Sequence, residues 1–233
     1  MRECNSSAST IAVRSRWTFP PRDEVEVIAA RLEEAARSIN EVRNEAADLG
    51  LKFAFENHAG DTRSEEILAL IDEVGSDTLG VMIDPGNAVW ALEDPMKHLE
   101  ILSPHILCSS VRDYMVWDSE DGATFQWTPI GEGMMDVQTY TRTLREKAPG
   151  VPLFVETISN SARPIPYLTP EFLSGFPNLK AVQMLDFLSL SRHGWALEIV
   201  QPPAGMDAGE FDREHQQAEF MKSIRYLRQL ENV

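Results

Sequence analysis

The stretch LKFAFENHAGDTRSEEILALIDEVGSDTLGVMIDPGN, residues Leu51–Asn87, decides the fold of this chain. Its two ends contain short apolar runs, Leu51–Phe55 and Leu79–Ile83, which have the length and composition of buried strands. Between them, Arg63–Val74 repeats apolar residues at the three- and four-residue steps of an amphipathic helix. A strand, a helix and a strand in this order form a βαβ unit, whose two strands lie parallel in one sheet.

A carboxylate follows each of the two apolar runs. Glu56 comes directly after the first run and Asp84 directly after the second. In parallel α/β folds the functional groups gather at the carboxyl ends of the strands, so both acids are expected at the same edge. Two acids held side by side repel each other unless a cation or a shared proton intervenes. The pair therefore predicts a divalent metal site.

The rest of the chain continues the alternation of strands and helices. A long segment, Tyr114–Gly133, is rich in polar, aromatic and glycine residues and is predicted to be a lid or binding loop, and Ser159–Gly175 is predicted to be irregular. The further strands are expected at Thr10–Arg14, Ile106–Val111, Pro152–Val155 and Leu179–Leu185, and the further helices at Asp23–Leu49, Leu92–Leu102, Val137–Ala148 and Phe211–Leu230.

About six strands that alternate with helices, without an internal linker, predict a single α/β domain over residues 1–233, with residues 1–9 disordered. The long connections lie on the side where strands end in Glu or Asp. That arrangement favours a β/α barrel of the TIM type over an open sheet. No glycine-rich phosphate loop follows any of the predicted strands, which argues against a dinucleotide-binding fold.

Composition excludes several classes of partner. The net charge of −16 over 233 residues argues against nucleic acid or an anionic membrane surface. No apolar run approaches the ~18 residues of a membrane span, which predicts a soluble protein. Cys4 and Cys108 have neither metal-site spacing nor a disulfide framework, which fits a reducing cytoplasm.

Five motifs in order along the chain resemble the sugar phosphate isomerase/epimerase superfamily, the xylose isomerase-like barrels. The resemblance runs from about residue 10 to the end. It is carried by FENH (Phe55–His58), LGVMIDPGN followed by LEDP (Leu79–Asn87 and Leu92–Pro95), SVRD (Ser110–Asp113), PIGEG followed by Asp136, and FVE (Phe154–Glu156). Each motif alone is weak, whereas their order and their placement at strand ends are fairly specific.

The resemblance implies a divalent cation, Mn²⁺ or Mg²⁺, held at successive strand ends by Glu, Asp, His and Glu. Glu56, Asp84 and Glu156 match three of these positions, and Ser110 stands at the place of the histidine. Carboxylate oxygens suit Mg²⁺ or Mn²⁺, whereas a neutral serine hydroxyl is a poor metal ligand. The few histidines, five in all, argue against the related endonuclease branch.

The resemblance also assigns roles. Glu56 and Glu156 are implied as the acid and the base that flank the substrate. The expected contacts to a small-molecule sugar are His58, which strand alternation places on the side of Glu56, together with Asn87, Arg112, Asp113 and Trp117. Ordinary strand-end acids that cap helices or pair with arginine are the alternative reading of the same carboxylates.

The family barrel has eight strands, and this chain begins near the third. The resemblance therefore implies an incomplete barrel, for which a chain truncated at its N-terminus is favoured over completion by another chain or a rearranged fold. Open strand edges favour self-association, so a homo-oligomer is among the expected states.

Three hypotheses follow for the function. The first is a metal-dependent isomerase or epimerase of a sugar or keto-sugar derivative that transfers a proton next to a carbonyl. The second is a dehydratase or lyase on a related keto-sugar, in which the leaving group differs. The third is a non-catalytic sugar-binding relative or an inert fragment.

Overall fold

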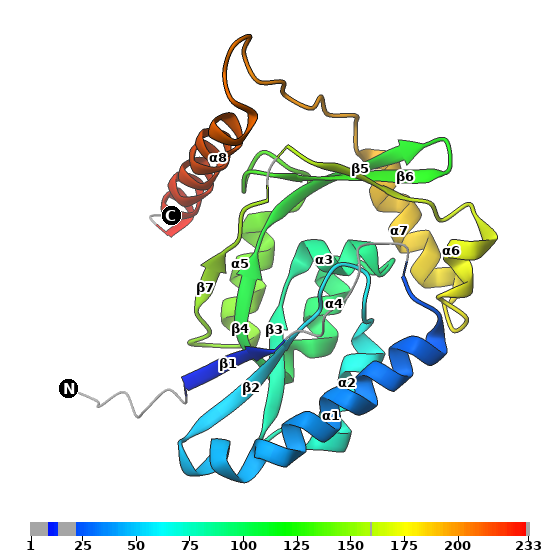
Figure 1. Ribbon diagram of the computed structural model, residues 1–233, viewed down its shortest axis with the longest axis vertical. Helices are drawn as coiled ribbons and strands as arrows, with labels where there is room; N and C mark the ends of the chain where they lie inside the picture. Colours follow the sequence, from blue (N-terminus) through cyan, green and yellow to red (C-terminus); the bar gives the residue numbers. More distant parts are fainter. Residues whose placement is uncertain (1–8, 14–21, 159, 232–233) are drawn as a thin grey trace.

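The computed structural model describes residues 9–13, 22–158 and 160–231. A parallel sheet of five strands, in the order β1-β2-β3-β4-β7, forms its centre (Figure 1). The strands are β1 (Ser9–Val13), β2 (Leu51–Glu56), β3 (Leu79–Ile83), β4 (Ile106–Val111) and β7 (Leu153–Val155). Neighbours in this sheet are all parallel, and the two outer strands do not meet, so the barrel is open.

Helices cover one face of this sheet. Apolar side chains of α1 (Val25–Asp48), α2 (Ser64–Val74), α4 (Pro95–Leu102) and α5 (Val137–Lys147) form one buried cluster with β2 and β3. Ile67, Ile71 and Leu99 are at most 1% exposed in this cluster. The three- and four-residue spacing read from the sequence therefore places the apolar side of each helix against the strands.

A second sheet, antiparallel and three-stranded, begins where β4 ends. Its order is β5-β6-β8, with β5 (Asp113–Ser119), β6 (Gly122–Thr128) and β8 (Ala162–Ile165). A single residue, Arg112, separates β4 from β5, so this sheet starts at the carboxyl edge of the parallel sheet. It packs through Phe125 and Trp127 against the short helix α3 (Pro85–Trp90), with ring centroids of Trp90 and Phe125 4.8 Å apart.

The strands predicted for the parallel core lie close to the observed ones, whereas one predicted loop and one predicted strand were wrong. Tyr114–Gly133 forms mainly the β5–β6 hairpin, whose two-residue turn is Glu120-Asp121, between the paired Ser119 and Gly122. Leu179–Leu185 lies largely in a helix, α7 (Ala181–His193), which packs against β5 and at whose start the Gln183 side chain accepts the Lys180 N–H. The parallel sheet thus has five strands among the described residues, whereas about six were expected.

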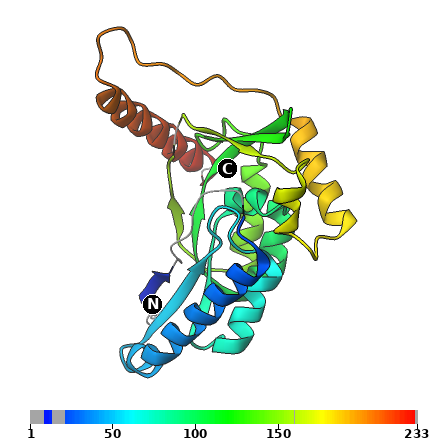
Figure 2. The same cartoon turned by 45° about the vertical axis from the view of Figure 1, so that its right-hand side comes forward.

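The remaining elements are short segments between the two sheets and the helices, and a C-terminal helix. The predicted irregular segment contains β8 and the short helix α6 (Pro170–Ser174), and a short 3-10 turn, η1 (Ser103–His105), precedes β4. An extended segment after α7 crosses to α8 (Ala208–Glu231), which Figures 1 and 2 both show on the opposite side of the molecule from α7. Side chains of α8 pack against β7 in a small third cluster.

Two predictions fall partly or wholly outside the described residues. Disorder was expected for residues 1–9, of which only Ser9 is described, as the first residue of β1. Arg14, the expected end of that strand, lies outside the described residues. None of the described helices combines the length and the apolar character that a membrane span requires.

Candidate metal centre

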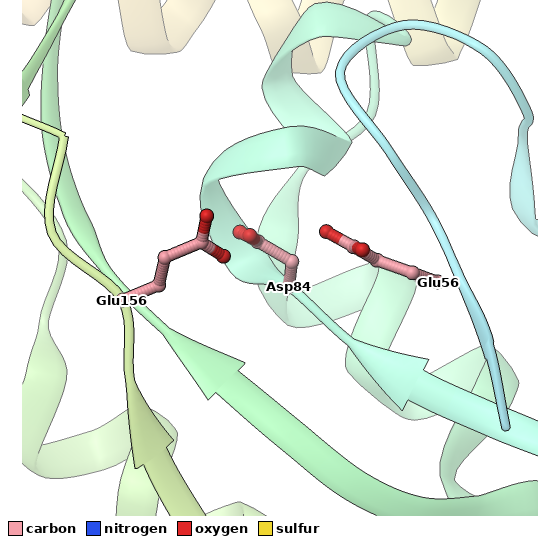
Figure 3. A group of neighbouring side chains, drawn as sticks. All are labelled: Glu56, Asp84 and Glu156. Atoms are coloured by element: carbon pink, nitrogen blue, oxygen red, sulfur yellow. The ribbon is translucent and has the colours of Figure 1, made fainter. Parts of the chain in front are cut away.

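Three carboxylates meet at the carboxyl edge of the parallel sheet (Figure 3). Glu56 is the last residue of β2, Asp84 follows β3, and Glu156 follows β7. One oxygen of each lies within 4.8 Å of the others. The residues come from distant parts of the chain and converge because parallel strands present their carboxyl ends at one edge.

Asp84 is held rigidly in this group. Its Oδ1 accepts the N–H groups of Gly86 (2.9 Å) and Asn87 (3.1 Å) at the start of α3, so the carboxylate serves as the helix N-cap. Asn57 bonds the Asp84 backbone on both sides, accepting its N–H and donating to its carbonyl, each at 2.8 Å. Sequence reasoning missed Asn57, since an amide next to a strand-end acid carries no specific signal.

The side chain of Asn87 links two of the acids. Its Nδ2 donates to Asp84 Oδ2 at 3.0 Å and to Glu56 Oε1 at 3.4 Å. Ser110, on β4, donates its hydroxyl to Glu156 Oε2 at 2.8 Å. The sequence placed Ser110 among the metal ligands. In the structure its hydroxyl donates to one of the other predicted ligands, Glu156, and so orients that carboxylate.

A cationic side chain, that of Arg112, lies within the cluster. Its side chain is 4% exposed, and its Nη2 lies 2.6 Å from Asp84 Oδ2 and 2.8 Å from Glu156 Oε2. The same nitrogen lies 3.7 Å from Glu56 Oε1. The guanidinium carbon stands 4.3 Å from the ring centroid of Trp127, in cation–π range.

Trp127 reaches the site because α3 presents glycine to it. A Cβ at Gly86 would lie 2.1 Å from Trp127 Cζ3, so only glycine leaves room for the indole. Trp117, the tryptophan expected at the substrate, lies four residues along β5 from Asp113 and pairs with Thr124. At about 3.3 Å per residue, that is about 13 Å from the start of the strand.

Asp113 does not face the acids through a free carboxylate. Its Oδ1 accepts the N–H groups of Tyr114 and Met135, and its Oδ2 accepts those of Gly131 and Gly133. The sequence placed Asp113 among the substrate contacts. In the structure its carboxylate anchors the loop that leads from β6 to α5.

His58 lies at the rim of the site. Its Nδ1 is 3.0 Å from Asp61 Oδ2, and this hydrogen bond raises the pKa of His58, with smaller effects of opposite sign from burial and from Arg112. Burial raises the pKa of Asp61 to about 6 in spite of this partner. His58 and Asp61 therefore form a hydrogen-bonded pair beside the acidic cluster.

The charges of the site favour a divalent cation. Three carboxylates gather around the Arg112 guanidinium, and Glu56 and Asp84 are buried, so the repulsion between these acids is costly in a medium of low polarity. Burial raises the pKa of Asp84 to about 6, against the opposing effect of Arg112, and the neighbouring Glu56 and Glu156 raise it further. Three hard oxygen donors that repel one another fit Mg²⁺ or Mn²⁺.

The fold and this site define an incomplete parallel β/α barrel with an acidic cluster at its carboxyl edge. The family model described as xylose isomerase-like TIM barrel matches residues 8–188. The chain belongs to this family.

A relative with a known name is the 3-oxo-isoapionate decarboxylase of Pectobacterium atrosepticum, 28% identical over 96 residues. That match covers 40% of this chain and 35% of the relative. The chain thus spans about a third of the length of the curated relatives it matches.

Solved structures share the fold. A xylose isomerase-like TIM barrel protein from Mycobacterium smegmatis in complex with magnesium has a TM-score of 0.52 at 14% identity, covering 78% of this chain and 61% of that one. D-psicose 3-epimerase, solved in the presence of D-fructose, has a TM-score of 0.51 at 16% identity, covering 90% and 62%.

Proposed function

We propose that this chain is a divalent-metal-dependent isomerase or epimerase of a sugar or keto-sugar derivative. The observation that carries the proposal is the convergence of Glu56, Asp84 and Glu156 within 4.8 Å at the carboxyl edge of the sheet. Membership of the xylose isomerase-like family supports it, and the fold is shared with a protein named D-psicose 3-epimerase.

Mn²⁺ or Mg²⁺ would be held by Glu56, Asp84 and Glu156, with the Ser110 hydroxyl orienting the last of these. When bound, the cation would polarise a substrate carbonyl and stabilise the negative charge that develops beside it.

The two glutamates stand on either side of Asp84 in Figure 3. We assign to one of them the removal of the proton next to the carbonyl and to the other its return. Glu56 is 8% exposed, whereas 40% of the Glu156 side chain is exposed. The two carboxylates therefore differ in solvation, which is the condition for one to act as the acid while the other acts as the base.

Polar groups around the cluster are suited to sugar hydroxyls. Asn87 and Arg112 donate hydrogen bonds to the acids, and His58 is paired with Asp61 beside them. Trp127 is 5% exposed and its ring lies against the Arg112 guanidinium, so it supports Arg112. We keep His58, Asn87 and Arg112 as proposed substrate contacts.

A lyase on a related keto-sugar is the second candidate, favoured by the match to a protein named as a decarboxylase. The two reactions share their first requirement. Loss of a proton or loss of CO₂ next to a carbonyl leaves an electron pair on the same carbon, and a cation held by the same three carboxylates would stabilise that charge. In the lyase the C–C bond breaks, CO₂ leaves, and a glutamate delivers a proton to the carbon.

The first experiment is the metal content of the purified chain after incubation with Mn²⁺ and removal of unbound ions. Glu156→Gln removes one proposed ligand, and Glu100→Gln, an exposed acid on α4, is the matched control. We expect about one ion per chain in the wild type and in Glu100→Gln, and a loss of that ion in Glu156→Gln.

The reaction is then tested with keto-sugars in D₂O. An isomerase or epimerase incorporates deuterium at the carbon next to the carbonyl, which NMR detects. Release of CO₂ or water from the substrate assigns the lyase. Metal binding without deuterium incorporation or product would contradict both reactions and favour a non-catalytic sugar-binding role.

Three expectations from the sequence remain predictions. A location in the cytoplasm rests on cysteine usage, and the absence of nucleic acid among the partners rests on the net charge of −16. Association into a homo-oligomer rests on the open edges of the parallel sheet, formed by β1 and β7.

A further inference from the structure

One nitrogen atom occupies the space between the three carboxylates. Arg112 Nη2 lies 2.6 Å from Asp84, 2.8 Å from Glu156 and 3.7 Å from Glu56. The oxygens it approaches belong to the same three side chains that would hold a metal ion. The guanidinium therefore stands where a cation of this cluster would stand.

A guanidinium and a divalent ion compete for these oxygens. A divalent ion such as Mg²⁺ requires oxygens at about 2.1 Å, and a nitrogen 2.6–2.8 Å from two of them fills that space. Asp84 Oδ1 already accepts two backbone N–H groups, whereas Oδ2 accepts one amide N–H, from Asn87, besides its contact with Arg112. Oδ2 is therefore the oxygen of Asp84 for which an ion and Arg112 compete.

The hold on Arg112 is incomplete. Its Nε is buried without a hydrogen-bond partner among the described residues, which is unfavourable for a charged group. The guanidinium also lies over the ring of Trp127, with its carbon 4.3 Å from the centroid. Arg112 therefore has a favourable contact that does not depend on the carboxylates.

We propose that Arg112 is the internal cation of this acidic site and that a divalent metal ion binds in exchange for it. As the ion enters, the guanidinium leaves the oxygens of Asp84 and Glu156 and stays over Trp127. Exchange of one positive charge for two lowers the repulsion among the three carboxylates. This inference rests on the metal site of the proposed function and adds the residue that sets its affinity.

The test is the dissociation constant of Mn²⁺, measured from the free-ion EPR signal at pH 7.5. Arg112→Gln removes the competing charge. Arg112→Lys keeps the charge, as a compact ammonium in place of the planar guanidinium. We expect Arg112→Gln to bind Mn²⁺ at least about tenfold more tightly, because a positive charge within a few Å opposes a divalent ion. Arg112→Lys should stay close to the wild type.

The failures of the two proposals are distinguishable. Equal or weaker binding by Arg112→Gln overturns the exchange, even when the wild type binds Mn²⁺ and turns over a keto-sugar. Binding by Arg112→Gln but not by the wild type would mean that Arg112 blocks the site, which overturns the exchange and removes metal-dependent catalysis from the native chain. Binding by neither protein overturns the exchange as well, since removal of the competitor should expose the oxygens.

A measurement on the wild type covers the case in which Arg112→Gln does not fold. Displacement of the guanidinium should change the emission of Trp127 on addition of Mg²⁺, which is not itself a paramagnetic quencher. Trp127→Phe should remove that change while Mg²⁺ still competes with Mn²⁺. Unchanged emission of the wild type at a Mg²⁺ concentration that displaces Mn²⁺ would overturn the exchange.

Discussion

Replacement of Asp113 by alanine should destabilise the fold far more than loss of one surface acid. The side chain is fully buried, and its two oxygens accept four backbone N–H groups at 2.8–3.1 Å. Three of these amides belong to the loop over Gly131–Met135. That loop closes around the carboxylate, because a Cβ at Gly133 would lie 2.2 Å from Asp113 Oδ1.

The magnitude follows from the amides that lose their partner. A water molecule in the vacated space can bond two of the four N–H groups, which leaves two unsatisfied. At about 1.5 kcal/mol for each, Asp113→Ala should lower the free energy of unfolding by about 3 kcal/mol. Urea unfolding at pH 7, followed by far-UV circular dichroism, measures this change as a shift of the midpoint at constant slope.

The matched control is Asp136→Ala. Asp136 is exposed and caps α5 through one hydrogen bond, from the N–H of Thr139 at 2.9 Å. Its removal changes the net charge by the same amount and should cost about 1 kcal/mol. A loss in Asp113→Ala no larger than that in Asp136→Ala would refute the loop-anchoring role of Asp113.

Two further predictions concern the acidic cluster. Burial raises the pKa of Asp84 to about 6 from 3.8, so the folded metal-free chain holds this proton more tightly than the unfolded chain does. The contribution of Asp84 to the free energy of unfolding is therefore complete below pH ~4 and is lost as the pH rises through about 6. The expected change is about 3 kcal/mol, measured by urea unfolding in the presence of a chelator. Asp84→Asn should flatten this dependence, and an unchanged pH profile would contradict it. Ser110→Ala should weaken Mn²⁺ binding about tenfold through loss of the bond that orients Glu156, as measured by titration. Ser109→Ala, whose hydroxyl instead donates to the Pro152 carbonyl, should bind Mn²⁺ like the wild type.

The parallel core could be predicted because its signals are local. β2 and β3 were expected to end near Glu56 and Asp84, and the structure places both carboxylates at one edge. The strand predicted at Leu179–Leu185 is largely a helix, α7, in the structure. A short apolar run fits a strand as well as a helix, and packing against β5 decides between them. The segment of the β5–β6 hairpin was predicted to be a lid or binding loop, because polar and aromatic residues obscure the two-residue alternation of its strands.

The sequence by itself determined which residues stand at the strand ends and that three of them are acids. Periodicity and chain order are sufficient for that, because parallel strands place their carboxyl ends at one edge. Only the tertiary structure decided what lies between the acids. Arg112 meets Asp84 and Glu156 from other segments of the chain, and Trp127 supports it from the second sheet. Such contacts depend on side-chain directions across separate elements, which no pattern along one segment encodes.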